Sequence, residues 1–233
     1  MNDYSQIKKE AYLANMQIAK NKLAICTFGN ASAADQNKDI FAIKPNGVDY
    51  ENLSVEKMVV VDFNGTIVDG NLRPSSDTKT HAVLYKNWKK LGGIVHTHST
   101  YATSWAQAQW DIPIYGTTHA DHLVEDVPCI LVMNDNMIEG DYELETGYQI
   151  LDDFKKRGYN YLEIPMAIVA CHAPFTWAET AEKAVYNSIV LEEIAKMAWI
   201  TKSIKPNASK LKQTLKQKHY QRKHGDNAYY GQS

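Results

Sequence analysis

The sequence predicts an α/β fold in which helices cover a central mixed or antiparallel β-sheet. The first observation is that helical and strand-like segments alternate irregularly along the whole chain. The second is that several strand-like segments follow one another with no helix between them. A doubly wound parallel sheet would need a helix at each of these connections. The third is the length of 233 residues, which suits one domain with a sizeable core.

Apolar residues at helical spacing indicate the helices. Ile7, Ala11, Ala14 and Ile18 recur at this spacing and predict a helix over residues 3–20. Further helices are predicted over residues 78–91, 144–157, 178–204 and 209–223. Glycine is common just beyond a helix C-terminus, and Gly92-Gly93 and Gly158 stand at two of these ends.

Short runs rich in β-branched and aromatic residues indicate the strands. We expect strands at residues 23–28, 40–43, 59–63, 66–68, 94–98, 129–133 and 166–172. Asn64-Gly65 separates two of these runs and predicts a tight hairpin, because this pair readily adopts the positive φ angles of such a turn. The sheet and the helices together are expected to form a single domain over residues 1–233.

The bulk composition excludes several classes of protein. The chain is 44% hydrophobic with a formal net charge of −2, so nothing indicates disorder or a nucleic-acid partner. It has no apolar signal segment at its start and no apolar run of the roughly 20 residues that span a bilayer. Three cysteines without a paired spacing indicate reduced, buried thiols. We therefore expect a cytoplasmic protein with no membrane partner.

Three histidines form a candidate metal site. His96 and His98 lie on a predicted strand, where alternate residues point to the same face, and His172 ends a later strand. Three imidazoles with one open position are typical of catalytic zinc. Cys171 would face away on its strand, which argues against it as a fourth ligand. The alternative is that these histidines are ordinary hydrogen-bonded residues, because a lone His-x-His is a weak signal.

Short polar segments that follow strands or precede a helix form a candidate phosphate site. They can expose backbone N–H groups, and a helix N-terminus favours an anion. These segments are Gly29-Asn30, Lys44, Asn46-Gly47 and Ser75-Ser76-Asp77. The alternatives are ordinary turns and, for the last segment, simple capping of the following helix.

The motifs of this chain, taken in order, resemble those of bacterial L-ribulose-5-phosphate 4-epimerases in the class II aldolase/epimerase superfamily. The matching motifs are Gly29-Asn30, Ser75-Ser76-Asp77, His96-Thr97-His98, Thr117-Thr118-His119-Ala120-Asp121, Cys171-His172-Ala173-Pro174-Phe175, His219–Gly225 and Ala228–Gln232. The resemblance covers nearly the whole chain. The three histidines are shared with fuculose-phosphate-type aldolases, whereas the Ser-Ser-Asp, Thr-Thr-His-Ala-Asp and tail motifs are specific to the epimerase branch.

The resemblance implies a role for each matching residue. It implies that His96, His98 and His172 hold Zn²⁺, or another divalent ion such as Mn²⁺ or Co²⁺, with Asp77 beside the metal. The implied phosphate- and substrate-binding residues are Gly29, Asn30, Lys44, Asn46, Gly47, Ser75 and Ser76. The implied acid/base pair is Asp121 and Tyr230, supported by His219 and Arg222. One departure is Asn46, because family members often carry serine there.

The implied reaction inverts C4 of a ketopentose phosphate by cleaving and re-forming the C3–C4 bond. The metal acts as a Lewis acid, and two acid/base groups serve the two faces of the substrate. Aldolases of the superfamily typically have a glutamate near the metal, and the shorter Asp77 here favours epimerisation. The resemblance also implies a homotetramer whose sites lie between subunits, with residues 209–233 contributing to them.

Two alternative functions remain at this stage. One is a class II aldolase that acts on another keto-sugar phosphate. The other is a non-catalytic aldolase-like binding module, which would be expected to lack the histidine ligands. Among single residues, His81, His119 and His122 are interpreted as polar or helix-surface positions, Asp121 as a possible turn former, and the basic run of 210–223 as a solvated helix face. The supplying pathway, such as arabinose or ascorbate breakdown, stays open.

Overall fold

In the computed structural model, which describes residues 3–225 and 228–229, eight strands form one central sheet. The strand order is β4-β3-β2-β1-β5-β8-β7-β6. All neighbouring strands are antiparallel except β6 and β7, which are parallel. The strands are β1 Asn30–Asp35, β2 Ile40–Ile43, β3 Val59–Asp62, β4 Ile67–Asp69, β5 Gly93–His96, β6 Cys129–Ile130, β7 Met166–Val169 and β8 Pro174–Ala178. The predicted mixed, mostly antiparallel α/β fold is confirmed.

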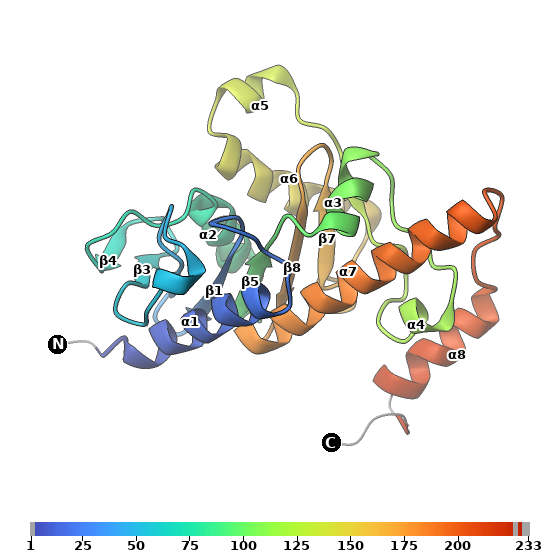
Figure 1. Cartoon of the computed structure of the whole chain (residues 1–233), viewed down its shortest axis with the longest axis horizontal. Coiled ribbons are helices and arrows are strands. Elements are labelled where there is room, and N and C mark those ends of the chain that lie inside the picture. Colours follow the sequence, from blue (N-terminus) through green and yellow to red (C-terminus); the bar gives the residue numbers. More distant parts are fainter. Residues whose placement is uncertain (1–2, 226–227, 230–233) are drawn as a thin grey trace.

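Helices pack on both faces of this sheet (Figure 1). Helix α1 (Ser5–Lys20) and the first half of α7 (Ala181–Ile204) cover one face, whereas α2 (Thr78–Asn87) and α6 (Tyr142–Arg157) cover the other. Strand residues alternate between the two cores: Val60 packs with the α1 side and Val61 with the α2 side. The sheet is thus buried on both faces, which explains its continuous apolar runs.

Shorter helices lie between these elements along the chain. They are the 3₁₀ helix η1 (Tyr50–Asn52), α3 (Thr100–Gln107), α4 (Thr117–Ala120) and α5 (Asp135–Glu139). The last described helix, α8 (Gln213–His224), lies beside α4 at one end of the molecule (Figure 1). Salt bridges from Lys210 to Asp126 and from Lys216 to Glu125 attach it there. Lys210, Lys212 and Lys218 of the basic run are exposed, as predicted for a solvated helix face, whereas Lys216 and Arg222 are partly buried and pair with acidic residues of their own chain.

Several predicted strands differ from the observed ones. Those predicted at 94–98, 129–133 and 166–172 end earlier, at His96, Ile130 and Val169. Residues 23–28 form turns rather than a strand, with Ile25 and Phe28 exposed, and the strand begins later at Asn30. Strand β8 was missed because Pro174 interrupts the pattern, although proline is tolerated as the first residue of a strand. The strand at 40–43 and the hairpin around Asn64-Gly65 are confirmed.

The two predicted glycine stops differ in their outcome. Gly158 ends α6 in the left-handed conformation at φ 69°, as predicted. Helix α2, however, ends at Asn87, before Gly92 and Gly93. Gly93 is instead the first residue of β5, where an added Cβ would lie 2.3 Å from the Cα of Ala181. The glycine is needed there because β5 and the start of α7 approach each other closely.

Candidate metal and phosphate site

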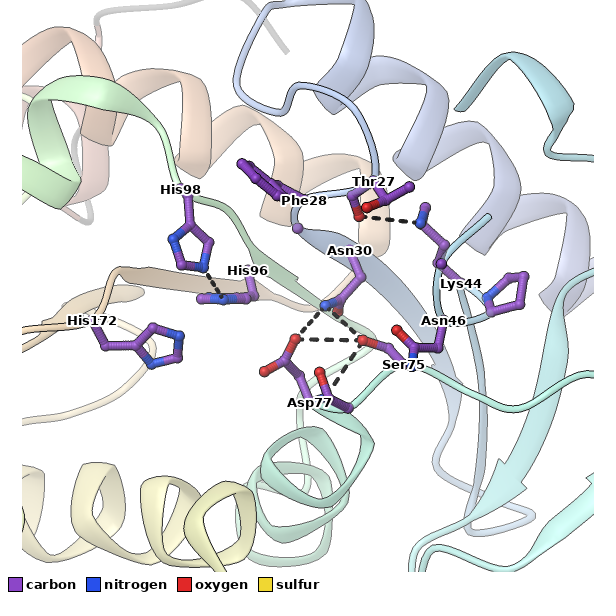
Figure 2. A pocket seen from close by; sticks show the side chains of 14 residues that line it. Thr27, Phe28, Asn30, Lys44, Asn46, Ser75, Asp77, His96, His98 and His172 are labelled. Carbon is purple, nitrogen blue, oxygen red and sulfur yellow. Dashed lines mark hydrogen bonds between the residues drawn. The ribbon is translucent and has the colours of Figure 1, made fainter. Parts of the chain in front are cut away.

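A polar cavity of about 310 Å³ lies where the loops around β1, β2 and β5 meet the start of α2. Figure 2 shows His172 on one side of it and Lys44 on the other, with Asn30 and Asp77 between them. The lining residues are Thr27, Phe28, Gly29, Asn30, Lys44, Pro45, Asn46, Gly47, Ser75, Ser76, Asp77, His96, His98 and His172. The structure thus brings together every residue predicted for the metal and phosphate sites. Sequence reasoning missed Thr27, Phe28 and Pro45.

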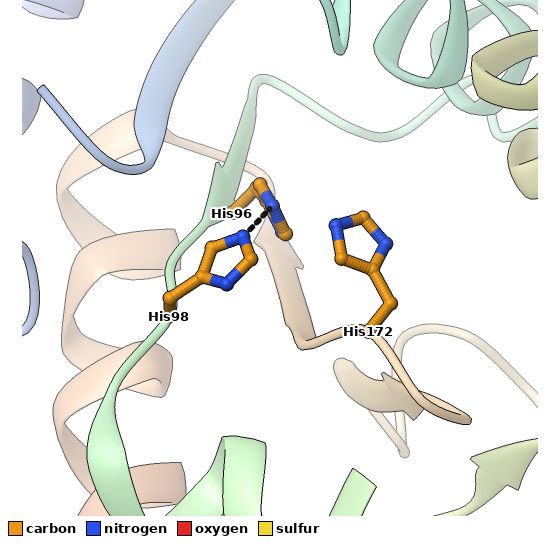
Figure 3. Close-up of side chains that lie close together, drawn as sticks. All are labelled: His96, His98 and His172. Carbon is orange, nitrogen blue, oxygen red and sulfur yellow. Dashed lines mark hydrogen bonds between the residues drawn. The ribbon is translucent and has the colours of Figure 1, made fainter. Parts of the chain in front are cut away.

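The three histidines converge on one point (Figure 3). One ring nitrogen from each of His96, His98 and His172 lies within 4.8 Å of the others. The Nε2 atoms of His96 and His98 are 3.2 Å apart. Two nitrogens on a tetrahedral zinc ion would be separated by about 3.3 Å, given Zn–N bonds of roughly 2.0–2.1 Å. The three side chains therefore fit a divalent metal such as zinc.

The surroundings of the imidazoles support this use. His96 Nδ1 donates to the carbonyl oxygen of Pro174 at 3.0 Å, which leaves Nε2 available as a ligand. Its ring also stacks on Phe175, with centroids 4.2 Å apart. His172 Nδ1 is buried and has no hydrogen-bond partner among the described residues. Burial lowers the pKa of His172 to about 3, so this ring is neutral at pH 7, the form that binds metals.

The histidines meet for a reason other than the predicted one. Strand β5 ends at His96 and β7 ends at Val169, so His98 and His172 both lie in loops. Strand alternation therefore explains neither position. The cluster forms because β5 pairs with β8, which places the turn that carries His172 beside the end of β5. Cys171 is an exposed turn residue with φ 60°, so the strand argument for its orientation was also wrong.

Asp77 lies beside the histidines and is held by strand β1. Its Oδ2 accepts a hydrogen bond from Asn30 Nδ2 at 2.7 Å, and the same amide donates to Ser75 Oγ at 3.0 Å. Asp77 makes no side-chain capping bond to α2, so the capping alternative does not hold for it. Burial acts to raise the pKa of Asp77, but the rings of His96, His81 and His172 and the Asn30 bond together lower it. The carboxylate is therefore anionic at neutral pH.

Lys44 places a buried positive charge at the other side of the cavity. Only 1% of the residue is exposed, and its Nζ is 3.4 Å from the Thr27 carbonyl oxygen and 5.0 Å from the centre of the Tyr50 ring. Within the described residues, no carboxylate lies within salt-bridge distance of it. Burial lowers the pKa of Lys44. An anionic ligand would offset the cost of this unpaired charge.

The backbone donors of the cavity are only partly available. The N–H of Asn46 donates to Arg73 O and that of Ser75 donates to Lys44 O, so neither points to a ligand. The backbone N–H of Asn46 is therefore not available to a phosphate, which leaves its side chain as the possible contact. Gly29 has φ 72°, and an added Cβ would lie 2.7 Å from His96 O. Glycine at this position lets the loop pass close to β5.

Asp121 is the centre of a second polar cluster, formed with His219, Arg222 and His224. Its Oδ1 accepts from His219 Nδ1 and Arg222 Nε, both at 3.0 Å, and its Oδ2 accepts from Arg222 Nη2 at 2.8 Å. His224 Nε2 donates to its backbone oxygen at 2.9 Å. Burial acts to raise the pKa of Asp121, but its bonds to Arg222 and His219 lower it. Asp121 therefore has a larger structural role than a turn former.

This Asp121 cluster does not line the cavity of its own chain, at least among the residues that the structure describes. The structure thus brings the predicted supporting residues to Asp121 but not to the histidines. Tyr230, the other predicted acid/base group, lies outside the described residues. His81 and His119, expected on a surface, are both buried, and His81 belongs to the same helix as Asp77. The spacing of four residues between Asp77 and His81 could have indicated that His81 lies on the side of the helix that faces the cavity.

Comparisons with known proteins show the family of the chain and agree with its fold. A family model described as Class II Aldolase and Adducin N-terminal domain matches residues 9–199. The L-ribulose-5-phosphate 4-epimerases UlaF of Salmonella paratyphi C and Salmonella typhi are each 46% identical over 227 residues, which cover 97% of this chain and 99% of theirs. No helix within residues 3–225 combines the length and apolar character needed to cross a membrane.

Solved structures show the same fold at lower identity. An L-fuculose 1-phosphate aldolase matches with a TM-score of 0.78 and 23% identity, covering 95% of this chain and 97% of that one. An aldolase II superfamily protein from Pseudomonas syringae matches with a TM-score of 0.77 and 14% identity, covering 96% and 86%. The chain belongs to the class II aldolase and adducin family. Within that family, it is a relative of the L-ribulose-5-phosphate 4-epimerases.

Proposed function

We propose that this protein is a divalent-metal-dependent L-ribulose-5-phosphate 4-epimerase that interconverts L-ribulose 5-phosphate and D-xylulose 5-phosphate. The observation that carries this proposal is a single cavity with three converging imidazoles on one side and a buried, unpaired lysine on the other. That combination suits a substrate with a metal-binding carbonyl end and a phosphate end. The 46% identity to curated epimerases supports this particular substrate.

The chemistry of the reaction explains why these groups are needed. The C4 hydroxyl is β to the C2 carbonyl, so removing its proton allows the C3–C4 bond to break. The bond electrons form the enediolate of dihydroxyacetone, and C4 becomes the aldehyde of glycolaldehyde phosphate. When the aldehyde turns over and the bond re-forms on its other face, C4 is inverted and the new alkoxide takes up a proton.

The cavity residues perform the binding part of this reaction. A divalent ion held by His96, His98 and His172 would supply Lewis acidity to the oxygen atoms of the substrate. Lys44 and the hydroxyl groups of Ser75 and Ser76 bind the phosphate and so retain the aldehyde fragment while it turns. The remaining predicted contacts to the substrate come from Gly29, Asn30, Asn46 and Gly47. Asp77 stays anionic beside the ion.

Asp121 and Tyr230 transfer the protons in this proposal. Asp121 is held as a carboxylate by Arg222 and His219, so it is ready to accept a proton from a hydroxyl group. Because Asp121 lies outside the cavity of its own chain, the proposal requires a second chain to supply it. We therefore infer a homotetramer in which residues 209–233 and Asp121 of one subunit complete the metal cavity of a neighbour.

A coupled assay of L-ribulose 5-phosphate conversion tests the function directly. We expect D-xylulose 5-phosphate to form with the zinc-loaded protein, and activity to disappear with a chelator and return with Zn²⁺, Mn²⁺ or Co²⁺. The same samples should be examined for dihydroxyacetone and glycolaldehyde phosphate. If these fragments accumulate and no xylulose 5-phosphate forms, the protein is an aldolase and the proposal is wrong.

A further inference from the structure

A line of polar side chains connects the cavity to the core between β1 and α2. On β1, Asn30 and Ser32 are two residues apart and face α2, because the intervening Ala31 packs on the α1 side. Asp77, at the N-cap of α2, recurs at a spacing of four residues with His81 and Tyr85 within the helix, so the three lie along one side of it. We call these five residues the polar seam. The matched spacing of strand and helix allows each strand residue to contact the helix residues opposite it.

The hydrogen bonds of the polar seam are short. Asn30 Nδ2 donates to Asp77 Oδ2 at 2.7 Å. Deeper in the molecule, Ser32 Oγ is 2.7 Å from His81 Nδ1 and 2.7 Å from the hydroxyl group of Tyr85. Ser32, His81 and Tyr85 are each 0% exposed. The outer part of the seam serves the cavity, and the inner part joins His81 to the core.

His81 has one ring nitrogen that the described residues leave unused. Its Nε2 is buried and has no hydrogen-bond partner, although Nδ1 is bonded to Ser32. Its ring lies among Phe41 and Phe175, with centroid separations of 6.4 and 6.3 Å. A buried polar atom without a hydrogen bond lowers the stability of the fold, so we expect His81 Nε2 to have a partner. The charged groups that act on His81 are Asp77 and His96, both in the cavity.

The bonding of Ser32 indicates which nitrogen carries the proton. A serine hydroxyl has one proton, and it can satisfy both neighbours if it accepts from Tyr85 and donates to His81 Nδ1. The imidazole then carries its own proton on Nε2 and needs an acceptor there. Asp77 lies one turn earlier on the same helix face, and its Oδ1 has no hydrogen bond among the described residues. The carboxylate is therefore the natural acceptor.

We propose that His81 is a positioning residue of the metal site, whose Nε2–H is hydrogen-bonded to Asp77 Oδ1 through one buried water. Asn30 then holds one oxygen of the carboxylate and His81 holds the other. This arrangement fixes the orientation of Asp77 beside the three histidine ligands. The inference rests on the proposed metal site, but its test measures metal binding and is independent of the identity of the substrate.

The test uses two substitutions that mimic different nitrogens of the ring. His81→Asn places an amide near the position of Nδ1, which keeps the contact with Ser32 but does not reach Asp77. His81→Gln places an amide near the position of Nε2, which can still donate to Asp77. We expect His81→Asn to weaken Zn²⁺ binding about 10- to 100-fold in a chelator competition, as losses of outer-shell partners typically do. His81→Gln should stay within about threefold of wild type under the same scale of effects.

Two further variants keep the test decisive. Thr80 lies on the same helix, but its buried hydroxyl group donates to Glu143 O and not to the polar seam. Thr80→Val therefore controls for general damage to α2 and should bind Zn²⁺ normally. Ser32→Ala leaves His81 in place but removes the hydrogen bond to its Nδ1, so it should also weaken Zn²⁺ binding. This variant carries the test if His81→Asn does not fold. Wild-type Zn²⁺ affinity in folded His81→Asn or in Ser32→Ala would overturn the inference. Failure of the wild-type protein to bind Zn²⁺ would instead refute the proposed metal site itself.

Discussion

The cavity and the Asp121 cluster both contain buried or partly buried charged and histidine side chains, but they differ in how far these groups are paired. In the cavity, Lys44 has no carboxylate partner and His172 Nδ1 has no hydrogen bond among the described residues. In the Asp121 cluster, both carboxylate oxygens and the backbone oxygen of Asp121 already accept hydrogen bonds. Unsatisfied buried groups favour ligand binding, whereas satisfied ones favour a fixed geometry. The difference suggests that one region binds the metal and phosphate and the other presents a rigid acid/base group.

Removal of a cavity histidine should have the largest effect. We expect His172→Ala to lose its bound divalent ion and to reduce turnover by about 10³-fold or more, because several kcal/mol of charge stabilisation disappear. Metal analysis and the coupled assay measure both quantities. His122→Ala, in the loop next to Asp121, is the matched control and should retain its metal. Full metal content in His172→Ala would show that the imidazoles converge for another reason.

Substitution in the Asp121 cluster should affect turnover without affecting the metal. Asp121→Asn removes the proton acceptor, and we expect turnover to fall by about 10²- to 10⁴-fold at unchanged zinc content. Asp39→Asn, which breaks an exposed salt bridge to Lys89, is the control and should stay close to wild type. A wild-type rate for Asp121→Asn would remove this carboxylate from the mechanism. The same expectation applies to Tyr230→Phe.

The phosphate side of the cavity should show an intermediate effect. We expect Lys44→Met to lower kcat/KM by about 10- to 100-fold, because a charge-assisted hydrogen bond to the phosphate is lost. Lys38→Met changes an exposed lysine that pairs with Asp35 and serves as the control. Steady-state kinetics on L-ribulose 5-phosphate provide the measurement. If both variants match wild type, the phosphate binds elsewhere.

The last prediction concerns stability rather than turnover and involves a histidine close to the Asp121 cluster. Burial lowers the pKa of His119, on α4, to about 4, whereas the unfolded chain has a value of roughly 6.5. The folded protein therefore binds fewer protons, so stability is complete above pH 6.5 and falls as the pH drops towards 4. His119 alone should account for about 3 kcal/mol of this loss. Denaturant unfolding between pH 4 and 7 should show a shallower pH dependence for His119→Asn, and equal slopes would contradict the assignment.

The sequence predicted the cavity better than it predicted the path of the chain around it. The histidines and the phosphate segments carry recognisable motifs, so their grouping was expected before the structure. His98 and His172, however, are positioned by the pairing of β5 with β8, a long-range contact that no local pattern contains. The apolar run at 23–28 was predicted to be a strand, although Phe28 is exposed. A local pattern does not indicate which apolar residues will be buried.

Buried polar residues were the hardest to predict. His81 and His119 were interpreted as surface positions but are buried. Histidine occurs both on surfaces and in cores, so the residue type alone does not predict its burial. The pairing of Asp121 with His219 and Arg222 joins positions about a hundred residues apart, and their proximity had no local signal. Motif resemblance suggested that these residues belong together, but only the fold shows which atoms meet.

The central claim is that the cavity of one subunit and the Asp121 cluster of a neighbour form one active site. Subunit mixing tests it most directly. His98→Asn chains lack a complete metal site and Asp121→Asn chains lack the acid/base group, so each should be inactive alone. After proven subunit exchange, some interfaces would combine an intact cavity with an intact Asp121, and we expect epimerase activity to return. If the mixed oligomers stay as inactive as the parent variants, each chain builds its own site and the claim is wrong.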